Sequence, residues 1–231
     1  MREITVTIGG RQACGRGGPL RVEAGCGYRQ RMQPKVIFFD LGGVVCRFLP
    51  QRRLAALAEA CGVSVEQVES ELYASGLIEE WDRGLGSSAE IHHAVRERLG
   101  YPGNLPALRK VWCRAFEPDP QVLDQVDGVR PLRTALLTDN DHLLLDALPE
   151  ELPQVASRFD ALLFSCRFGA TKPSAGVFSQ ALDAMGSVAD EAVFIDDKPA
   201  NVAAAQELGI TAILFSGAAG LGPALDTVLS Q

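Results

Sequence analysis

The residues of this sequence that could carry out chemistry stand where short apolar runs end. Taken alone, each has an ordinary structural use, such as starting a glycine turn or capping a helix. Here, however, such residues follow several successive apolar runs: they are aspartates, a threonine and a lysine. No structural need explains why residues of these types would come together at one site in a fold. In chain order they are Asp40, Thr138 with Asp139, Lys172, and Asp196 with Asp197.

This set has a coherent chemistry in phosphoryl transfer. A carboxylate such as Asp40 can attack phosphorus and form an aspartyl-phosphate, which divides one difficult displacement into two easier steps. An anion that attacks another anion needs charge neutralisation, and Mg²⁺ held by a few carboxylates supplies it. Asp40, Asp196 and Asp197 would meet that need. Thr138 and Lys172 would then hold the remaining phosphoryl oxygens.

The apolar runs themselves predict the strands of a parallel sheet. From Lys35 onward they alternate with helical patterns, which is typical of a sheet with crossover helices. We therefore expect an α/β fold with a Rossmann-like, doubly wound parallel sheet, in which the loops at the carboxyl ends of the strands converge on one crevice. The expected strands are 36–39, 134–137, 161–164, 192–195 and 211–214.

The long stretch between the first two expected strands predicts a helical insert. Its apolar residues recur at helical spacing almost throughout, so we expect a cap of roughly four helices. Serines followed three residues later by Glu or Gln match capping boxes, and glycines or prolines mark the ends. The expected stripes are 54–61 before Gly62, 64–72 from Ser64 with Gln67, 87–99 from Ser87 with Glu90 to Gly100, and 108–116 before Pro118.

The expected domain organisation has three parts. Residues 34–46 and 130–231 form the catalytic core, 47–129 form the helical cap, and 1–33 form an N-terminal extension. The extension holds six arginines, two glutamates and no lysine, and it has little apolar surface to bury, so we expect it to be loosely ordered. Met32 stands just before the first strand, which fits an upstream extension of the reading frame; a mitochondrial transit peptide is a weaker alternative.

Composition narrows the classes of protein that fit. The net charge is −7, which argues against a general affinity for nucleic acid or for an anionic membrane. Six scattered cysteines without a regular framework indicate reduced thiols. No apolar run is long enough to span a bilayer. We therefore expect a cytoplasmic monomer or homodimer.

Four ordered segments resemble the signature motifs of the haloacid dehalogenase superfamily. The resemblance extends from about residue 35 to residue 215, and the helical insert stands where that family carries its helical cap. The segments are VIFFDLGGVV at 36–45, LLTDN at 136–140, GATKPSAGVF around Lys172, and AVFIDDKPANVAAAQELGI from Ala192.

The resemblance implies a nucleophile and a metal site. Asp40 is then the nucleophile, and Asn201 orients the loop that carries the aspartate pair. The implied ligands of Mg²⁺ are the backbone carbonyl of Gly42 and the carboxylates of Asp40, Asp196 and Asp197.

The resemblance also implies where the substrate is held. Thr138 and Lys172 bind the phosphoryl group. Gly43 and Asp139, which belong to the first and second motifs, are further candidate substrate contacts. Arg47, just after the first loop, is a candidate by its position alone.

Three positions depart from the family pattern. The family usually has a second aspartate two residues after the nucleophile, as general acid and base, where this chain has Gly42. Val44 replaces a frequent threonine, and Asp139 a frequent asparagine. A branch that includes sugar-phosphate phosphatases resembles the DLGG form, so Gly42 does not imply inactivity, but the acid-base step is left open.

The expected function is that of a Mg²⁺-dependent phosphomonoester hydrolase acting on a small phosphorylated metabolite. Two alternatives remain. A haloacid dehalogenase would use an ester at Asp40 without a metal, and the Asp196–Asp197 pair counts against it. A non-catalytic phosphate-binding module of the same fold would have lost its acid-base residue.

Overall fold

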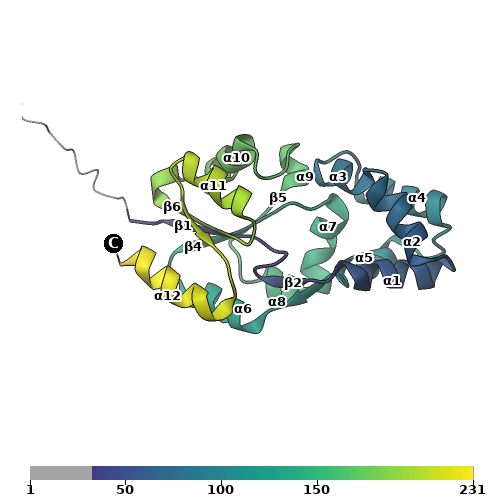
Figure 1. The fold of residues 1–231 in the computed structure, drawn as a ribbon, viewed down its shortest axis with the longest axis horizontal. Coiled ribbons are helices and arrows are strands. Elements are labelled where there is room, and N and C mark those ends of the chain that lie inside the picture. The colour runs from purple at the N-terminus through teal and green to yellow at the C-terminus, as the bar shows by residue number, and fades with distance from the viewer. Residues whose placement is uncertain (1–32, 231) are drawn as a thin grey trace, which may run out of the picture. The chain divides into compact units, whose positions relative to one another are not determined.

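The computed structural model describes residues 33–230, so the predicted N-terminal extension lies outside the described residues except for its last position. A parallel sheet of five strands forms the core, in the order β5-β4-β1-β6-β7 (Figure 1). All five expected strands are present, which confirms the α/β fold. They are β1 (Val36–Phe39), β4 (Arg133–Thr138), β5 (Ala161–Phe164), β6 (Ala192–Asp196) and β7 (Thr211–Leu214).

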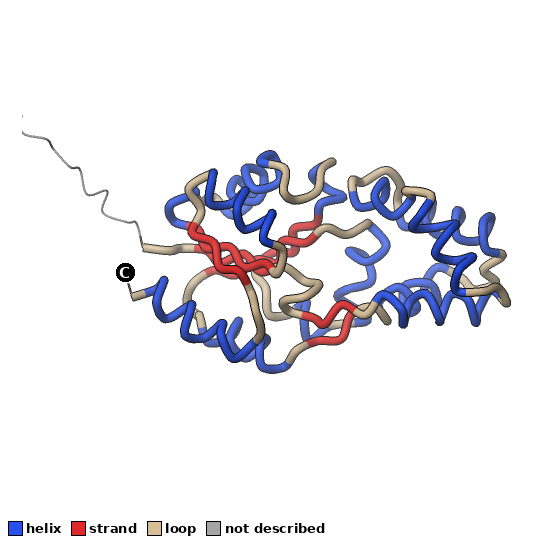
Figure 2. Tube along the Cα trace, viewed as in Figure 1, coloured by secondary structure: helices blue, strands red, loops and turns tan. Residues whose placement is uncertain are grey.

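Helices cover both faces of this sheet (Figure 2). Successive strand side chains point to opposite faces: Phe39 packs in a cluster with residues of α6, α7 and α12, and Phe38 in one with residues of α10 and α11. Burying each such side chain contributes about 1.5–3 kcal/mol. The helices are α6 (Pro120–Gly128), α7 (His142–Glu151), α8 (Pro153–Ala156), α9 (Ser165–Phe168), α10 (Ala175–Met185), η2 (Ala189–Glu191), α11 (Pro199–Glu207) and α12 (Ala218–Leu229).

The strand order changes direction at β1. The chain adds β4 and β5 on one side of β1 and then crosses to the other side for β6 and β7. Phe39 pairs in parallel register with Leu136 of β4 and with Ile195 of β6, so the three strands end within two residues of one another. Loops that follow neighbouring strands on the two sides of such a reversal diverge and leave a crevice between them.

A helical insertion lies between β1 and β3 (Phe116–Pro118), as predicted. Ser87 and Glu90 form a reciprocal capping box at the start of α4, and the hydroxyl of Ser64 caps α2. Gly62 and Gly100 follow α1 and α4 in the left-handed conformation. The helices are α1 (Pro50–Cys61), α2 (Val65–Val68), the π-helix η1 (Glu69–Ala74), α3 (Leu77–Asp82), α4 (Ser88–Leu99) and α5 (Leu105–Cys113).

Two details of the predicted insertion are wrong. The last apolar stripe does not continue as a helix to Phe116, because α5 ends at Cys113 and Phe116 belongs to a strand. The prediction of four helices also merges separate pieces, since η1 continues directly from α2 and the short α3 follows it. Apolar periodicity reports which side chains are buried, and it does not show where a helix changes its pitch.

An antiparallel ladder joins the insertion to the core and has no counterpart in the sequence prediction. β2 (Cys46–Phe48) pairs with β3, placing Cys46 opposite Pro118 and Phe48 opposite Phe116. The rings of Phe48 and Phe116 lie 5.3 Å apart between centroids, and aromatic pairs of this kind stabilise a ladder. The chain therefore enters and leaves the insertion at adjacent positions.

The residue bounds expected for the cap, 47–129, stay a prediction. α6 falls inside that range, yet it packs against α12 of the core. We propose that the insertion ends with β3 and that α6 belongs to the core. Among residues 33–230, no helix combines the length and the apolar character that crossing a bilayer requires.

Candidate active site

Three loops of the candidate site begin where neighbouring strands end. Asp40 follows β1 directly, Thr138 is the last residue of β4 and Asp196 is the last residue of β6. The backbone N–H of Asp40 donates to the carbonyl of Ile195 at 2.9 Å, which ties the first loop to β6. The register of the sheet thus brings together side chains that lie far apart in the sequence.

Lys172 is buried among three acceptors. Its Nζ lies 2.9 Å from Oδ1 of Asp40 and 2.8 Å from Oδ2 of Asp196, and it donates to the carbonyl of Leu137 at 2.9 Å. An ammonium group has three donors, so every one is engaged. The lysine holds the two carboxylates close together and compensates part of their charge.

The charges in this cluster shift the acidity of its members. Burial raises the pKa of Asp40 to about 6, and the positive charge of Lys172 opposes that rise. Burial alone would lower the pKa of Lys172, but Asp40, Asp139 and Asp196 raise it above its ordinary value. Lys172 therefore stays charged at neutral pH, and Asp40 is largely ionised, as a nucleophile must be.

Asp196 is the most heavily bonded carboxylate of the site. Its Oδ2 accepts from Lys172 and, at 3.0 Å, from Nδ2 of Asn201. Its Oδ1 accepts from the backbone N–H of Lys198 at 2.8 Å, which shapes the turn into α11. Asn201, predicted to orient this loop, is buried and bonds directly to the carboxylate.

Asp40, Asp196 and Asp197 form a group that could hold a metal ion. One carboxylate oxygen of each lies within 4.8 Å of the others. Oxygens at this spacing can reach one Mg²⁺, which prefers oxygen ligands at about 2.0–2.1 Å. The residues present therefore fit the expected cation. Gly42 lines the same cavity as Asp40 and Asp197, and the role of its carbonyl stays a prediction.

Gly43 allows the first loop to pass beside Asp197. Its φ is +92°, a conformation that favours glycine, and a Cβ on it would overlap the carboxylate of Asp197. The place of Gly43 in the DLGG segment is thus explained by close packing against a candidate metal ligand. A direct contact of Gly43 with the substrate stays a prediction.

The second loop supplies a hydroxyl and another carboxylate. Oγ1 of Thr138 accepts from Nδ2 of Asn140 at 2.7 Å, and Oδ1 of Asp139 accepts from the backbone N–H of Lys172 at 2.9 Å. Burial raises the pKa of Asp139, with Lys172 opposing the rise. The residue that caps α7 is Asp141: it accepts from the backbone N–H of Leu144 and from Nε1 of Trp112.

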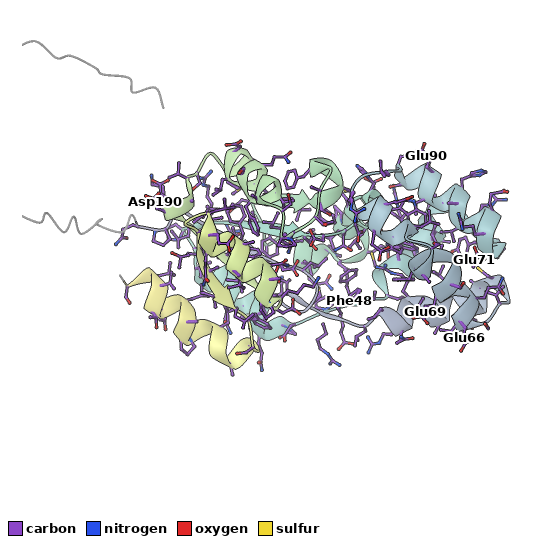
Figure 3. All side chains as sticks on the ribbon, turned by 45° about the horizontal axis from the view of Figure 1, so that its top comes forward. Phe48, Glu66, Glu69, Glu71, Glu90 and Asp190 are labelled. Atoms are coloured by element: carbon purple, nitrogen blue, oxygen red, sulfur yellow. The ribbon has the colours of Figure 1, made fainter. Side chains whose placement is uncertain are left out.

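A cavity of about 330 Å³ lies in front of these loops. Phe48 of β2, which Figure 3 labels, lines this cavity. Glu66, Glu69 and Glu90, labelled in the same figure, belong to α2, η1 and α4 and do not line it. The core contributes Asp40, Gly42, Thr138, Asp139, Asn140, Asp197 and Lys198; the insertion and its ladder contribute Phe48, Arg53, Tyr73, Ile78, Asp82 and Phe116.

The predicted site residues fall into three groups. Several line the cavity, whereas Lys172, Asp196 and Asn201 are buried and bonded to one another beside it. Two residues belong to neither group: Gly43 packs against the carboxylate of Asp197, and Arg47 is exposed on β2 and pairs with Glu117 of β3 at 2.9 Å. The cavity-lining predictions are Asp40, Gly42, Thr138, Asp139 and Asp197.

Sequence reasoning missed the residues that the insertion places in the cavity. The arginine on the cavity wall is Arg53 of α1, not Arg47. A signal for it exists, because Arg53 precedes Leu57 by four residues and therefore shares the apolar face of its helix. Tyr73 and Asp82 carry no comparable local signal, since nothing in their own segments shows which face meets the core.

Comparisons with known proteins agree with this geometry. The family model of the haloacid dehalogenase-like hydrolases matches residues 34–209. D-ribitol-5-phosphate phosphatase of Bacteroides thetaiotaomicron is 24% identical over 182 residues, which span 76% of this chain and 88% of that protein.

Solved structures show the same architecture. A HAD-like family hydrolase from Porphyromonas gingivalis superposes with a TM-score of 0.70 at 28% identity, over 87% of this chain and 100% of the other. A HAD family enzyme from Bacteroides thetaiotaomicron, in complex with magnesium and inorganic phosphate, gives 0.66 at 22% identity over 79% and 94%. With a family match over most of its length and this fold, the chain belongs to the haloacid dehalogenase-like hydrolases.

Proposed function

We propose that the protein is a Mg²⁺-dependent phosphomonoester hydrolase that acts on a small phosphorylated metabolite through an aspartyl-phosphate on Asp40. The observation that carries this proposal is the cluster of Asp40, Asp196 and Asp197 around one possible cation position at the wall of a cavity. Lys172 compensates the charge of two of these carboxylates. Relatives that act on sugar phosphates or hold magnesium with phosphate support the same class of substrate.

Hydrolysis would proceed in two displacements at phosphorus. A carboxylate oxygen of Asp40 bonds to phosphorus while the bond to the leaving oxygen breaks, and that oxygen takes up a proton and departs as an alcohol. Water then attacks the aspartyl-phosphate, the bond between phosphorus and Asp40 breaks, and inorganic phosphate leaves. Mg²⁺, held by the three carboxylates and the carbonyl of Gly42, would neutralise charge on the phosphoryl oxygens when bound.

The surrounding residues have separate proposed tasks. Thr138 presents its hydroxyl to a phosphoryl oxygen from the cavity wall, and Asn140 fixes that hydroxyl in place. Lys172 keeps Asp40 ionised and oriented. Asp139 accepts from the backbone N–H of Lys172 and so holds that residue in place. Gly43 and Asn201 keep Asp197 and Asp196 in position. Arg47 has no task in this proposal, because its partner is Glu117.

The test is turnover of para-nitrophenyl phosphate with and without Mg²⁺. We expect hydrolysis that chelation abolishes and added Mg²⁺ restores. Release of halide from 2-chloropropionate, independent of metal, would identify a dehalogenase instead. A folded protein that binds phosphate and turns over neither compound would be a binding module, and the proposal would be wrong.

A further inference from the structure

Arg53 is a buried cation whose hydrogen-bonding capacity is only partly used. It is 3% exposed, its Nε donates to the carbonyl of Trp112 at 3.0 Å, and its guanidinium lies 4.5 Å from the centroid of the Trp112 ring. Its Nη1 reaches the hydroxyl of Tyr73 only at 3.5 Å. Nη2 has no hydrogen-bond partner among the described residues. Three of the five N–H donors of the group, one on Nη1 and both on Nη2, therefore have no partner among the described residues.

The positive charge of Arg53 also lacks a close counter-ion. Among residues 33–230, no carboxylate forms a salt bridge with it, although six other arginines have one. Keeping a charge away from water without a partner is costly, and buried arginines are normally paired with anions. Because Arg53 lines the cavity, the missing anion can come from a bound molecule.

The polar groups beside Arg53 are suited to the same kind of partner. The hydroxyl of Tyr73 accepts from Arg53, which leaves its own proton free to donate. Burial raises the pKa of Asp82 to about 8, with Asp141 adding to the rise and Arg53 opposing it, so its carboxyl keeps a proton at neutral pH. Arg53, Tyr73 and Asp82 thus each carry a hydrogen-bond donor and line the same cavity.

Resting on the phosphatase function proposed above, we propose that Arg53, Tyr73 and Asp82 recognise a carboxylate on the leaving alcohol. The preferred substrates are then phosphate esters of small hydroxy acids. A carboxylate is an acceptor with two oxygens that match the fork of a guanidinium. A second phosphate fits less well, because one guanidinium would leave part of its double charge uncompensated.

The remaining walls of the cavity fit the carbon chain between the two anionic groups. Phe48, Ile78 and Phe116 supply apolar surface from the insertion and its ladder, while Asp40 and Thr138 stand on the core side. A cavity of about 330 Å³ accommodates a short chain. The phosphoryl group would lie at Asp40 and the carboxylate at Arg53, so chain length becomes a second determinant of specificity.

The experiment compares matched pairs of substrates. Phosphorylated hydroxy acids of increasing chain length are each set beside the compound with CH₂OH in place of the carboxylate, such as 3-phosphoglycerate beside glycerol 3-phosphate. At the best length, kcat/KM should favour the acid by about ten- to a hundredfold, as expected for a charge-assisted bidentate contact. Equal values for acid and alcohol at every length would overturn the inference.

Variants locate the preference. Arg53→Met should bring the acid-to-alcohol ratio close to one, and Arg53→Lys, which keeps the charge but not the fork, should retain part of it. Tyr73→Phe removes a single hydroxyl, so it tests the same recognition site if the arginine variants fail to fold. Arg52→Met is the matched control, because Arg52 is exposed on the same helix and pairs with Glu117. If the preference for the acid persists in Arg53→Met, another residue recognises the carboxylate and the inference is wrong.

A binding measurement separates this inference from the phosphatase proposal. Calorimetry of each acid and alcohol with the Asp40→Asn protein in Mg²⁺ requires no turnover. Tighter binding of the acid, lost in the Asp40→Asn, Arg53→Met double variant, supports recognition even if para-nitrophenyl phosphate is not hydrolysed. Equal affinity for both compounds overturns recognition while leaving the phosphatase activity standing.

Discussion

The two walls of the cavity differ in how fully their polar groups are bonded. Behind the core wall, Lys172 uses all three donors and Asp196 accepts from three groups. On the insertion wall, Nη2 of Arg53 has no partner among the described residues. The buried network that supports the core wall is therefore complete without a ligand, whereas the donors of Arg53 on the insertion wall are not all used.

Under the two proposals above, this difference separates the residues that act in the reaction from those that recognise the substrate. Groups that stabilise a reacting phosphoryl unit act best when they are already fixed, because no reorganisation is then needed during the reaction. Fully bonded networks on the ends of strands provide that rigidity. A donor left unpaired beside the same cavity has the opposite property, since its free energy falls only when the right acceptor binds.

The largest expected effect is on the core wall, at Asp40. Asp40→Asn keeps the shape of the side chain but cannot attack phosphorus, so turnover should fall by at least about a thousandfold. Phosphate release and thermal melting are measured together, with Asp183→Asn on the exposed surface of α10 as control. Residual activity within about tenfold of the wild type would contradict the nucleophile assignment.

The aspartate pair comes next. Asp196→Asn and Asp197→Asn should each raise the Mg²⁺ concentration needed for half-maximal rate, because each removes a charged ligand. The effect should be greater for Asp196, which also holds Lys172 and Asn201, than for the exposed Asp197. Titration of the rate with Mg²⁺ checks this. If both variants keep the Mg²⁺ dependence of the wild type, the two aspartates do not bind the metal and serve only the structure of the loop.

Gly43→Ala tests close packing on the core wall against a matched glycine in the insertion. Gly62 has a φ of +66° and open space around it, whereas Gly43 has a φ of +92° and the Asp197 carboxylate in the way. Both alanine variants should lose about 1–2 kcal/mol of stability from the left-handed backbone. Only Gly43→Ala should also weaken the response to Mg²⁺. Equal metal dependence in the two variants would show that Asp197 moves aside without consequence.

Gly42→Asp tests whether the core wall lacks a general acid. A Cβ at Gly42 would meet Phe48 and Phe116 at 3.5 Å, an ordinary contact, so the backbone there accepts a residue with a Cβ. Asp141 cannot replace it, because both of its oxygens already accept hydrogen bonds. In the wild type, the rate should therefore depend steeply on the pKa of the leaving alcohol.

The Gly42→Asp variant should gain most on alkyl phosphates, up to about 10²-fold, which is the lower range of general acid catalysis. A series of phosphate esters of graded leaving-group pKa, run on both proteins, measures the slope. A flat series in the wild type would mean that another residue already protonates the leaving oxygen.

The last expected effect lies on the insertion wall, where Asp82 makes the stability of the protein depend on pH. Its pKa of about 8 lies above the ordinary value, through burial first and then Asp141, with Asp139 and Glu79 adding and Arg53 opposing. The folded state thus keeps a proton that the unfolded state has released, so stability falls as pH rises from about 4 to 8. Asp82→Asn should remove this loss.

The melting temperature of Asp82→Asn relative to the wild type should therefore increase steadily between about pH 4 and pH 8. Melting of the two proteins across this range measures the difference, in which the contributions of all other groups cancel. A constant difference would show that the Asp82 carboxyl is ionised throughout, so that it has no proton to donate to a bound carboxylate.

The sequence predicts the core wall better than the insertion wall for a physical reason. Asp40, Thr138 and Asp196 each stand directly after a buried apolar run, and the parallel sheet brings such positions together. Tyr73 and Asp82 reach the cavity only through the packing of helices on one another, which no single segment encodes, and the only local signal for Arg53 is its place on the apolar face of its helix. The sequence does not predict the ladder of β2 and β3 either, because its two short strands lie far apart in the chain.

That ladder has a consequence for how the molecule tolerates change. Because Cys46 and Pro118 are paired, the ends of the inserted segment are pinned side by side whatever lies between them. Loop-closure entropy grows only slowly with length, by about 0.6 kcal/mol for each doubling. The segment between the two strands could thus vary in length while the register of β1 against β4 is kept, as long as the faces of α4 and α5 that pack on α7 remain. Under the proposed function, changes in the rest of this segment would alter which substrate is accepted while the strand ends that carry Asp40 and Asp196 stay in place.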